Sequence, residues 1–262
     1  MNKIYRNSFF SEIFKSKVIV ITGANGFLGD KLVELFLSYK AKLILIDKDK
    51  KLKLKIESSN PVSYHKCDFT NLNEVRKITN LIKSDVNKVD ILINNASYTG
   101  TNKKWLKSIN NQSIDDWNNA FRVTIDAVFL LSKSLSKQLQ NANGKIINIG
   151  SIFSERVPNF KNYKKTKMNS PAAYSASKNM LLHLTRWFAA NLAPKVNVNM
   201  ISPGGIERGQ PKIFKNKYIS KTPLNRMCKE EDLFGAIIFL SSDLSKYITG
   251  QNISIDGGYS LY

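Results

Sequence analysis

The amino-acid sequence predicts an α/β fold in which a doubly wound parallel sheet of about seven strands carries helices on both faces. Short apolar runs alternate with helix-length amphipathic stretches from residue 17 to residue 255. Each run is rich in Val, Ile or Leu and is bounded by Gly, Asn, Asp or Ser. Such runs are typical of parallel strands that are buried on both faces. The length of 262 residues suits one domain over residues 1–262.

The expected elements follow one another in alternating order. Strands are expected at residues 18–22, 42–46, 89–94, 144–149, 196–201 and 252–255, with a further strand that ends at Cys67. Helices are expected at residues 28–38, 72–87, 114–139, 171–191 and 230–241. This alternation predicts right-handed βαβ units. Three segments are expected outside the pattern: an N-terminal arm (residues 1–15), an inserted basic loop (residues 154–170) and a substrate loop (residues 206–228).

The composition is that of a globular and strongly basic chain, with 42% hydrophobic residues and a formal charge of +20. A basic surface attracts polyanions, but the lysines are scattered, and only residues 48–55 and 161–167 form dense clusters. Nucleic acid is therefore disfavoured as a partner. The charge fits a basic rim that attracts a phosphorylated or carboxylated substrate, or a Lys- and Asn-rich composition without a function.

Residue usage also bears on the compartment and on metals. Cys67 and Cys228 lie far apart and suggest neither a disulfide framework nor a metal spacing, which fits a reducing cytoplasm. His65 and His183 are the only histidines, so no metal site is expected. The apolar run at residues 18–21 is far shorter than the ~20 residues that span a membrane. We therefore expect a cytoplasmic protein with no membrane partner.

A glycine-rich turn, Thr22-Gly23-Ala24-Asn25-Gly26-Phe27-Leu28-Gly29, joins the first expected strand to the first expected helix. Glycines there let the backbone turn tightly and approach a pyrophosphate, whose charge the helix N-terminus stabilises. The strand–turn–helix context is the one that a Rossmann-type nucleotide site requires. The residues of this turn expected to bind the cofactor are Thr22, Gly23, Asn25, Gly26, Phe27, Leu28 and Gly29.

Asp47 closes the second expected strand, 18 residues beyond Gly29. An acidic side chain at this place accepts hydrogen bonds from the adenosine ribose hydroxyls and repels a 2′-phosphate. Lys48 and Lys50 follow directly and soften that repulsion. The pattern favours NAD over NADP as the cofactor.

Further candidates follow the third, fourth and sixth strands, at the carboxyl edge of the sheet, where ligands bind in open α/β folds. Asp68 is expected to reach the adenine, and the backbone near Ala96 to run beside the nicotinamide ribose. The cofactor-binding residues expected at this edge are Asp68, Phe69, Asn95, Ala96, Ser97, Pro203, Gly204 and Ile206.

Tyr174 and Lys178 stand four residues apart, which makes them neighbours on one face of the expected helix. A free tyrosine, with a pKa of about 10, is a poor base at neutral pH. A nearby cation favours the phenolate and brings that pKa toward the working range. Ser151 follows the fifth strand and so reaches the same carboxyl edge. These three residues are therefore the candidate catalytic residues.

With these motifs, the sequence resembles the short-chain dehydrogenase/reductase family over about residues 14–260. The resemblance implies that Tyr174 is the general acid/base and that Ser151 hydrogen-bonds the substrate oxygen. It implies that Lys178 binds the nicotinamide ribose and lowers the pKa of Tyr174, so that both residues contact the cofactor. Hydride would then pass between NAD(H) and a carbinol or carbonyl carbon. Members usually form dimers or tetramers, through helices that correspond to residues 114–139 and 171–191.

The sequence departs from the usual family pattern in three places. The glycine spacing 23/26/29 resembles the extended branch of the family, whereas the chain length and Asp256-Gly257-Gly258 favour the compact branch. Thr124 stands where many members carry a helix asparagine of the proton relay, which leaves that relay open. The spacing from Ser151 to Tyr174 is longer than in most members because of the basic loop at residues 154–170.

The inserted loop also resembles members that act in flagellin modification and surface-sugar synthesis, which suggests an anionic sugar or sugar nucleotide as substrate. Candidate substrate residues are Ser151, Phe153, Arg156, Tyr163 and Gly205. An epimerase or dehydratase that recycles its bound NAD is the alternative enzyme. The non-enzymatic alternative is an NAD-sensing or nucleic-acid-binding protein on the same scaffold, which the +20 charge and Thr124 favour.

Overall fold

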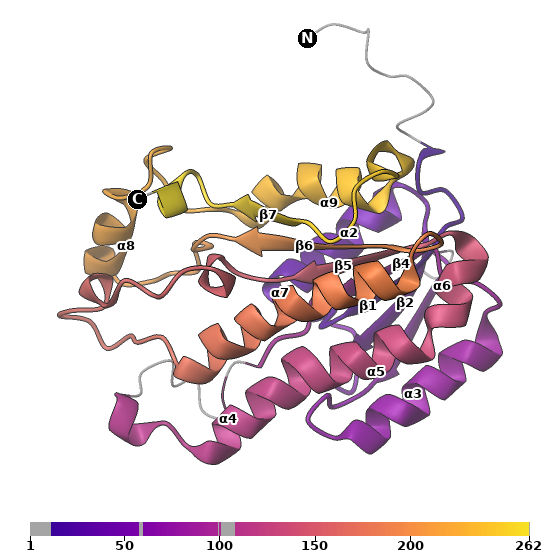
Figure 1. Cartoon of the computed structure of the whole chain (residues 1–262), viewed down its shortest axis with the longest axis horizontal. Helices are drawn as coiled ribbons and strands as arrows, with labels where there is room; N and C mark the ends of the chain where they lie inside the picture. The colour runs from indigo at the N-terminus through magenta and orange to yellow at the C-terminus, as the bar shows by residue number, and fades with distance from the viewer. Residues whose placement is uncertain (1–11, 58–59, 99, 101–107, 262) are drawn as a thin grey trace, which may run out of the picture.

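The computed structural model describes residues 12–57, 60–98, 100 and 108–261, and within them it contains the predicted seven-stranded parallel sheet (Figure 1). The strands are β1 (Val18–Thr22), β2 (Lys42–Asp47), β3 (Val62–Lys66), β4 (Ile91–Asn94), β5 (Lys145–Ile149), β6 (Asn197–Pro203) and β7 (Asn252–Ile255). Their spatial order is β3-β2-β1-β4-β5-β6-β7, and every neighbouring pair is parallel. The order reverses between β1 and β4, which is where open sheets of this kind bind ligands.

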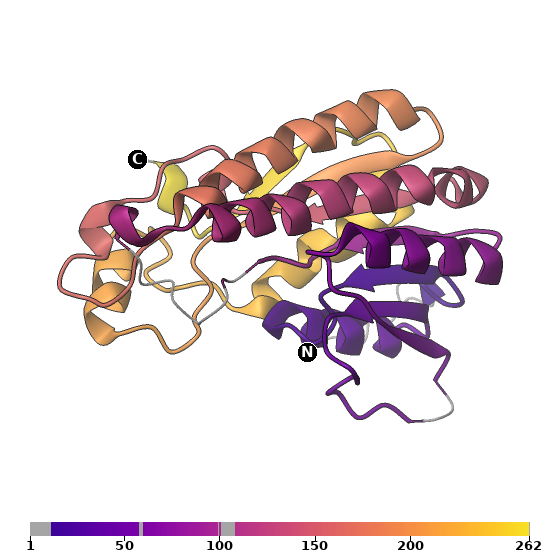
Figure 2. The ribbon, with the colours of Figure 1, turned by 90° about the horizontal axis from the view of Figure 1, so that it is seen from below.

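Two layers of α-helices cover the sheet, one on each face (Figure 2), while α8 lies beyond one end of it (Figure 1). They are α2 (Phe27–Ser38), α3 (Leu72–Asp85), α4 (Ile114–Phe121), α5 (Ala127–Ser134), α6 (Ser136–Ala142), α7 (Ala172–Leu192), α8 (Lys212–Ile219) and α9 (Phe234–Ser241). Helices α3, α5 and α7 cover one face, and α2 and α9 cover the other. Because successive side chains of a strand point to opposite faces, Val18 and Val20 pack under the first layer, and Ile19 and Ile21 under the second. Burial on both faces explains why the strands are nearly continuous apolar runs.

The expected helix over residues 114–139 is wrong as one continuous element. A π-helix (Arg122–Asp126) lies between α4 and α5, and α5 ends at Ser134, before Leu135, whose φ of −92° and ψ of 5° leave the helical region. The expected helix at residues 230–241 begins as a 3-10 helix (Glu230–Leu233) before α9. The expected substrate loop is also only partly irregular, since α8 lies within it.

Part of the N-terminal arm packs on the body of the protein. Phe14 is 1% exposed, and its ring lies edge-on to Phe36 and Tyr39, with centroids 5.2 and 5.4 Å away. This contact lies beside the C-terminal end of α2, at the amino edge of the sheet. The first eleven residues of the arm lie outside the described residues.

Candidate active site

Ser151, Tyr174 and Lys178 meet at the carboxyl edge of the sheet. Ser151 follows β5 directly, and its Oγ accepts a hydrogen bond from the backbone N–H of Phe153 at 3.2 Å. Tyr174 and Lys178 lie one turn apart on α7, with Lys178 Nζ 5.9 Å from the centroid of the Tyr174 ring. Lys178 is 3% exposed and donates to the Ile149 carbonyl at 2.7 Å. The structure thus brings together the three residues that were predicted to be catalytic.

The surroundings shift the pKa of both titratable groups in this cluster. Burial raises the pKa of Tyr174, while a hydrogen bond with Ser151 and the charge of Arg208 act in the opposite direction. Burial lowers the pKa of Lys178 to about 8. The lowering of the Tyr174 pKa by Lys178 stays a prediction. Lys178 is itself enclosed and turned toward the Ile149 carbonyl.

Thr124 lies in the π-helix between α4 and α5, is 3% exposed, and belongs to a segment that packs against α7. Single-turn π-bulges often occur at functional sites because they displace one residue from the regular helical pattern. The relay position predicted for Thr124 is therefore next to the helix that carries Tyr174. Its role as a relay stays a prediction.

The glycine turn is locked to β2 and β4 by hydrogen bonds. Gly23 has a φ of +69°, and its N–H donates to the Ile46 carbonyl at 2.8 Å. Thr22 Oγ1 accepts from the N–H groups of Asn95 and Ala96, both at 3.0 Å. The N-cap of α2 is Gly26, so no side chain caps the first turn of the helix, where Phe27 and Leu28 lie. Uncapped N–H groups at a helix start form an anion site.

Asp47 and Asn25 lie side by side beside this turn. Asp47 Oδ2 accepts from the Asn25 N–H at 3.0 Å, and the carboxylate is 7% exposed. The Asn25 side chain holds the loop after β2: it donates to the Lys51 carbonyl at 2.9 Å and accepts from the Lys53 N–H at 2.9 Å. Both the side chain and the backbone N–H of Asn25 thus have partners within the chain, and its contact with a cofactor stays a prediction.

The other predicted cofactor residues lie along the same edge with different exposure. Asp68 Oδ1 accepts from the N–H and the hydroxyl of Thr70. Phe69 is 5% exposed, and its side chain packs in the core. Ser97 is exposed after β4, and Ile206 pairs with Cys228 in the segment after β6.

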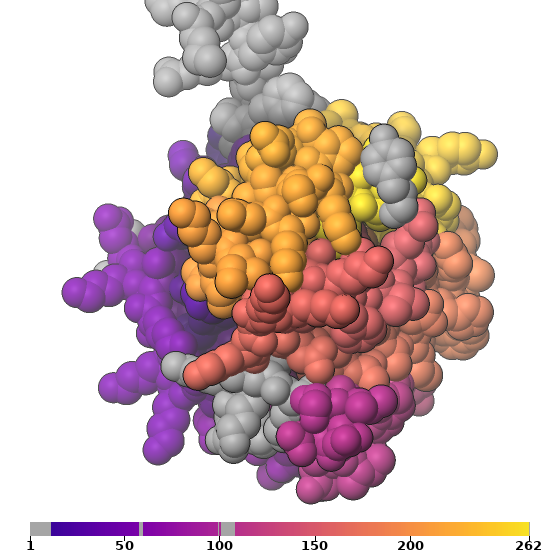
Figure 3. All heavy atoms as spheres, turned by 90° about the vertical axis from the view of Figure 1, so that its left-hand side faces the viewer, coloured from indigo at the N-terminus to yellow at the C-terminus, as the bar shows by residue number. Residues whose placement is uncertain are grey.

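The substrate side is closed by contacts between segments that are distant in sequence. Figure 3 shows the segments at residues 154–170 and 206–228 side by side over this edge. Tyr163 of the inserted loop lies 5.2 Å from the Phe214 ring, and Phe153 lies edge-on to Tyr174 at 6.4 Å. Gly205 N–H donates to the Tyr218 hydroxyl at 2.6 Å. Arg156 is exposed, and its role in binding the substrate stays a prediction.

Sequence reasoning missed four residues of this region. Tyr259 stacks on Tyr218 with centroids 4.2 Å apart, and its hydroxyl accepts from Asn162 at 2.7 Å. Arg208 Cζ lies 4.7 Å from the centroid of the Phe27 ring, and its charge counteracts the raised pKa of Tyr174. No spacing pattern links these residues, because they lie on different segments and meet only in the fold.

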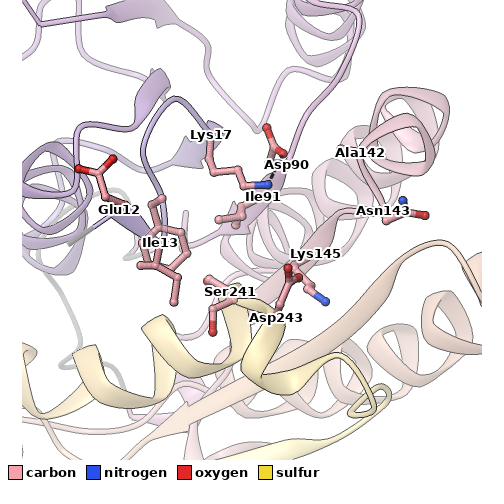
Figure 4. A pocket seen from close by; sticks show the side chains of 12 residues that line it. Glu12, Ile13, Lys17, Asp90, Ile91, Ala142, Asn143, Lys145, Ser241 and Asp243 are labelled. Atoms are coloured by element: carbon pink, nitrogen blue, oxygen red, sulfur yellow. Dashed lines mark hydrogen bonds and ion pairs between the residues drawn. The ribbon is translucent and has the colours of Figure 1, made fainter. Parts of the chain in front are cut away.

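A cavity of about 410 Å³ lies at the opposite, amino edge of the sheet (Figure 4). Lys17 and Asp90 point toward one another there, 3.1 Å apart, in front of β1 and β4. Lys145, the first residue of β5, also lines it. Because the reacting residues lie at the carboxyl edge, this cavity is separate from the candidate active site.

Within the part of the chain that the structure describes, no three His, Cys, Asp or Glu side chains are grouped so as to hold a metal ion. None of the helices in that part is both long and apolar enough to cross a membrane.

Substitution of Gly29 tests how tightly the glycine turn packs against the start of α2. A Cβ at this position would overlap the Gly23 carbonyl oxygen and lie 2.8 Å from the Ala24 carbonyl oxygen. We expect Gly29→Ala to lower the free energy of unfolding by about 3 kcal/mol, although alanine normally favours a helix. Denaturant unfolding measures this change.

The matched control is Gly235→Ala in α9, where an added Cβ meets no heavy atom within 4 Å. This variant should gain about 0.5–1 kcal/mol from helix propensity. A neutral or stabilising Gly29→Ala would contradict the tight packing of the turn.

Comparisons with known proteins agree with this geometry. A family model described as Enoyl-(Acyl carrier protein) reductase matches residues 23–260. A 3-oxoacyl-[acyl-carrier-protein] reductase of Buchnera aphidicola subsp. Baizongia pistaciae is 34% identical over 253 residues, covering 92% of this chain and 96% of the relative. Post-translational flagellin modification protein A of Campylobacter coli is 29% identical over 258 residues, covering 95% and 100%. A short-chain dehydrogenase structure from Leptospira borgpetersenii serovar Hardjo-bovis, with bound NAD+, matches with a TM-score of 0.87 at 34% identity, covering 99% and 98%.

The fold and the matched relatives define an oxidoreductase of the nucleotide-binding α/β class. The chain belongs to the short-chain dehydrogenase/reductase family.

Proposed function

We propose that this protein transfers a hydride between NAD(H) and a secondary alcohol or ketone. The observation that carries the proposal is the meeting of Ser151, Tyr174 and Lys178 at the edge of the sheet where the glycine turn also lies. A proton donor, an oxygen-binding hydroxyl and a cation are what the reduction of a carbonyl requires from the protein. The Leptospira borgpetersenii relative with bound NAD+ supports the nucleotide part of the proposal.

The residues of the chain fit a dinucleotide. The turn at Gly23 and the uncapped start of α2 suit a diphosphate, and Asp47 closes β2 beside them. Lys178 is the candidate to bind the nicotinamide ribose. Bound nicotinamide supplies or accepts the hydride.

Residues of the chain itself donate and accept the proton of the reaction. In the direction of reduction, Ser151 donates a hydrogen bond to the carbonyl oxygen and Tyr174 gives that oxygen a proton. In the direction of oxidation, the Tyr174 phenolate takes the proton from the alcohol. The positive charge of Lys178 stabilises the phenolate that forms. Thr124, beside α7, is the candidate to pass the proton onward to solvent.

We propose a sugar or sugar nucleotide of surface-polysaccharide or flagellin-glycan synthesis as the substrate. The likeness to flagellin modification protein A of Campylobacter coli supports this class. The basic inserted loop supports an anionic substrate, and Lys217 of α8 ties that loop to the substrate side through the Lys164 carbonyl at 2.6 Å. Tyr163, which is half-buried and packs against Phe214, provides an aromatic side chain against which a sugar ring packs.

The test is a screen of keto sugars and sugar nucleotides with NADH, followed at 340 nm together with product analysis. Net NADH oxidation in proportion to product supports the dehydrogenase. The glycine spacing 23/26/29 favours the alternative of an epimerase or dehydratase that recycles NAD. Such an enzyme would convert the sugar with no net change in NADH.

Asp47 is predicted to set the preference for NADH over NADPH. Asp47→Asn removes the charge that repels a 2′-phosphate, so the ratio of the NADPH Kd to the NADH Kd should fall by about tenfold or more. Fluorescence titration with both cofactors measures the ratio. Asp49→Asn removes the neighbouring carboxylate, which pairs with Lys53, and should leave the ratio nearly unchanged. A wild type that prefers NADPH, or an Asp47→Asn ratio equal to that of wild type, would contradict this role.

We also propose self-association through the layer formed by α4, α5 and α7. Helices α4 and α7 pack together in this layer. Large apolar side chains are exposed on it: Ile114, Trp117, Phe129, Met180 and Trp187. Exposed apolar clusters of this kind mark protein interfaces.

A further inference from the structure

Arg208, in the segment after β6, reaches the start of α2. Its Cζ lies 4.7 Å from the centroid of the Phe27 ring. Phe27 is the first residue of α2 and is 69% exposed, so it extends from the glycine turn toward solvent. A guanidinium at this distance over an aromatic face is held by a cation–π interaction. The pair therefore joins the substrate-side segment to the nucleotide turn.

The position of Arg208 is defined by its own loop. Its backbone N–H donates to Gln210 Oε1 at 2.8 Å, and Gln210 Nε2 donates to the Ile206 carbonyl at 2.8 Å. The guanidinium Nε donates to Glu230 Oε1 at 3.1 Å. Among the described residues, the structure gives the two terminal amino groups no hydrogen-bond partner. One side of the guanidinium is thus anchored, and its other side remains available to a ligand.

The charge of Arg208 also acts on the reacting end of the site, since it counteracts the raised pKa of Tyr174. One guanidinium is therefore close enough to influence Tyr174 while it lies over the first residue of α2. The glycine turn and the uncapped start of α2 are the residues that would hold the diphosphate of the proposed cofactor. The diphosphate is an anion, and its oxygens match the N–H donors of a guanidinium.

We propose that Arg208 binds the diphosphate of the dinucleotide over the start of α2, with the Phe27 ring holding its guanidinium in position. The inference rests on the proposed function. A guanidinium offers parallel N–H donors that match phosphate oxygens, and the uncapped first turn of α2 adds backbone N–H groups from the other side. Phe27, which was predicted to bind the cofactor, thus has a role in positioning Arg208.

The experiment measures binding to Arg208→Met and Arg208→Lys with three probes: NADH, ADP-ribose and adenosine. NADH is followed by fluorescence, and the other two by their displacement of NADH. Arg208→Met should weaken NADH and ADP-ribose by about tenfold or more each, and adenosine, which lacks the diphosphate, by less than about threefold. Arg208→Lys keeps the charge but loses the paired N–H donors of the guanidinium. Its affinities for NADH and ADP-ribose should therefore fall between those of the wild type and Arg208→Met.

Two further variants complete the experiment: a control at another arginine and a variant of the ring beneath Arg208. Arg76→Met removes an exposed arginine on α3 and should leave all three affinities unchanged. Phe27→Leu keeps an exposed apolar side chain but removes the ring under the guanidinium. It should weaken NADH and ADP-ribose by about threefold to tenfold, and it tests the pair even where Arg208→Met folds poorly.

Unchanged ADP-ribose binding in both Arg208→Met and Phe27→Leu would overturn the inference and leave the proposed function standing. A higher substrate KM with unchanged ADP-ribose binding would also overturn it, because Arg208 would then bind an anion of the substrate. A wild type that binds neither NADH nor ADP-ribose would overturn the proposed function together with the inference.

Discussion

Replacing Tyr174 by phenylalanine should lower kcat by about a thousandfold or more, because general acid–base catalysis contributes roughly 10²–10⁴-fold. The variant loses only the hydroxyl, which hydrogen-bonds with Ser151 and is the proton donor in the proposed reaction. The ring keeps its edge-on contact with Phe153, so the site retains its shape. NADH binding should therefore change by less than about threefold. Steady-state rates with the substrate found by the screen, together with NADH titration, separate the two effects.

Tyr39→Phe is the matched control for this experiment. Tyr39 packs edge-on against Phe14 at the amino edge, away from the reacting residues, and its variant should keep the wild-type rate. A Tyr174→Phe enzyme that retains more than about a tenth of the wild-type rate would contradict the acid–base role. Loss of NADH binding together with activity would instead indicate that Tyr174 supports the cofactor site.

Replacing Lys178 by methionine should stabilise the protein while it removes activity. Burial lowers the pKa of Lys178 from 10.5 to about 8, so the folded state disfavours the charged form. Such a shift corresponds to about 3 kcal/mol, of which the lost hydrogen bond to the Ile149 carbonyl offsets about 1 kcal/mol. We therefore expect Lys178→Met to raise the free energy of unfolding by about 1–2 kcal/mol at pH 7. Denaturant unfolding, with turnover measured in parallel, tests both halves of the prediction.

The difference in unfolding free energy between Lys178→Met and the wild type should depend on pH. Below pH 8, Lys178 is charged in both states and the cost of burying the charge is complete. Between pH 8 and 10.5 the unfolded state binds one more proton than the folded state, so the stability of the wild type rises with pH. The advantage of Lys178→Met should therefore shrink over this range and end above pH 10.5.

Among the described residues, Lys145 is a second buried lysine whose pKa is lowered by burial, and it lies at the amino edge with Asn197 as its hydrogen-bond partner. Lys145→Met should keep full activity. Comparison with Lys178→Met thus separates the effect of removing any buried charge from the effect of removing a catalytic residue. A Lys178→Met protein that is less stable than the wild type at pH 7 would contradict the account of Lys178 as a buried cation held for function.

The parallel sheet could be predicted because burial on both faces imposes continuous Val and Ile runs, as in β1. The edge strand β3 is different: it reads Val-Ser-Tyr-His-Lys and is half-exposed, so only its end beside Cys67 was predicted. The change to a π-helix between α4 and α5 also escaped prediction. The π-helix around Thr124 contains neither Pro nor Gly and so carries no local signal.

Part of the candidate site could be read from local spacing. The distance of four residues from Tyr174 to Lys178 places both on one helix face, and Ser151 follows a strand end. The pairing of Arg208 with Phe27 has no such signal, because a surface arginine is usually solvated and only the fold brings these residues together. The same holds for the buried polar chain from Asn94 through Asn148 to Thr185, whose members lie on β4, β5 and α7.

The central claim is that this chain binds a nicotinamide dinucleotide at the carboxyl edge of its sheet for hydride transfer. Titration of the purified protein with NADH and NADPH, followed by fluorescence, tests it most directly. The account predicts saturable NADH binding that is tighter than NADPH binding and is displaced by ADP-ribose. If the protein binds neither cofactor, the proposed function is contradicted, while the fold is not affected.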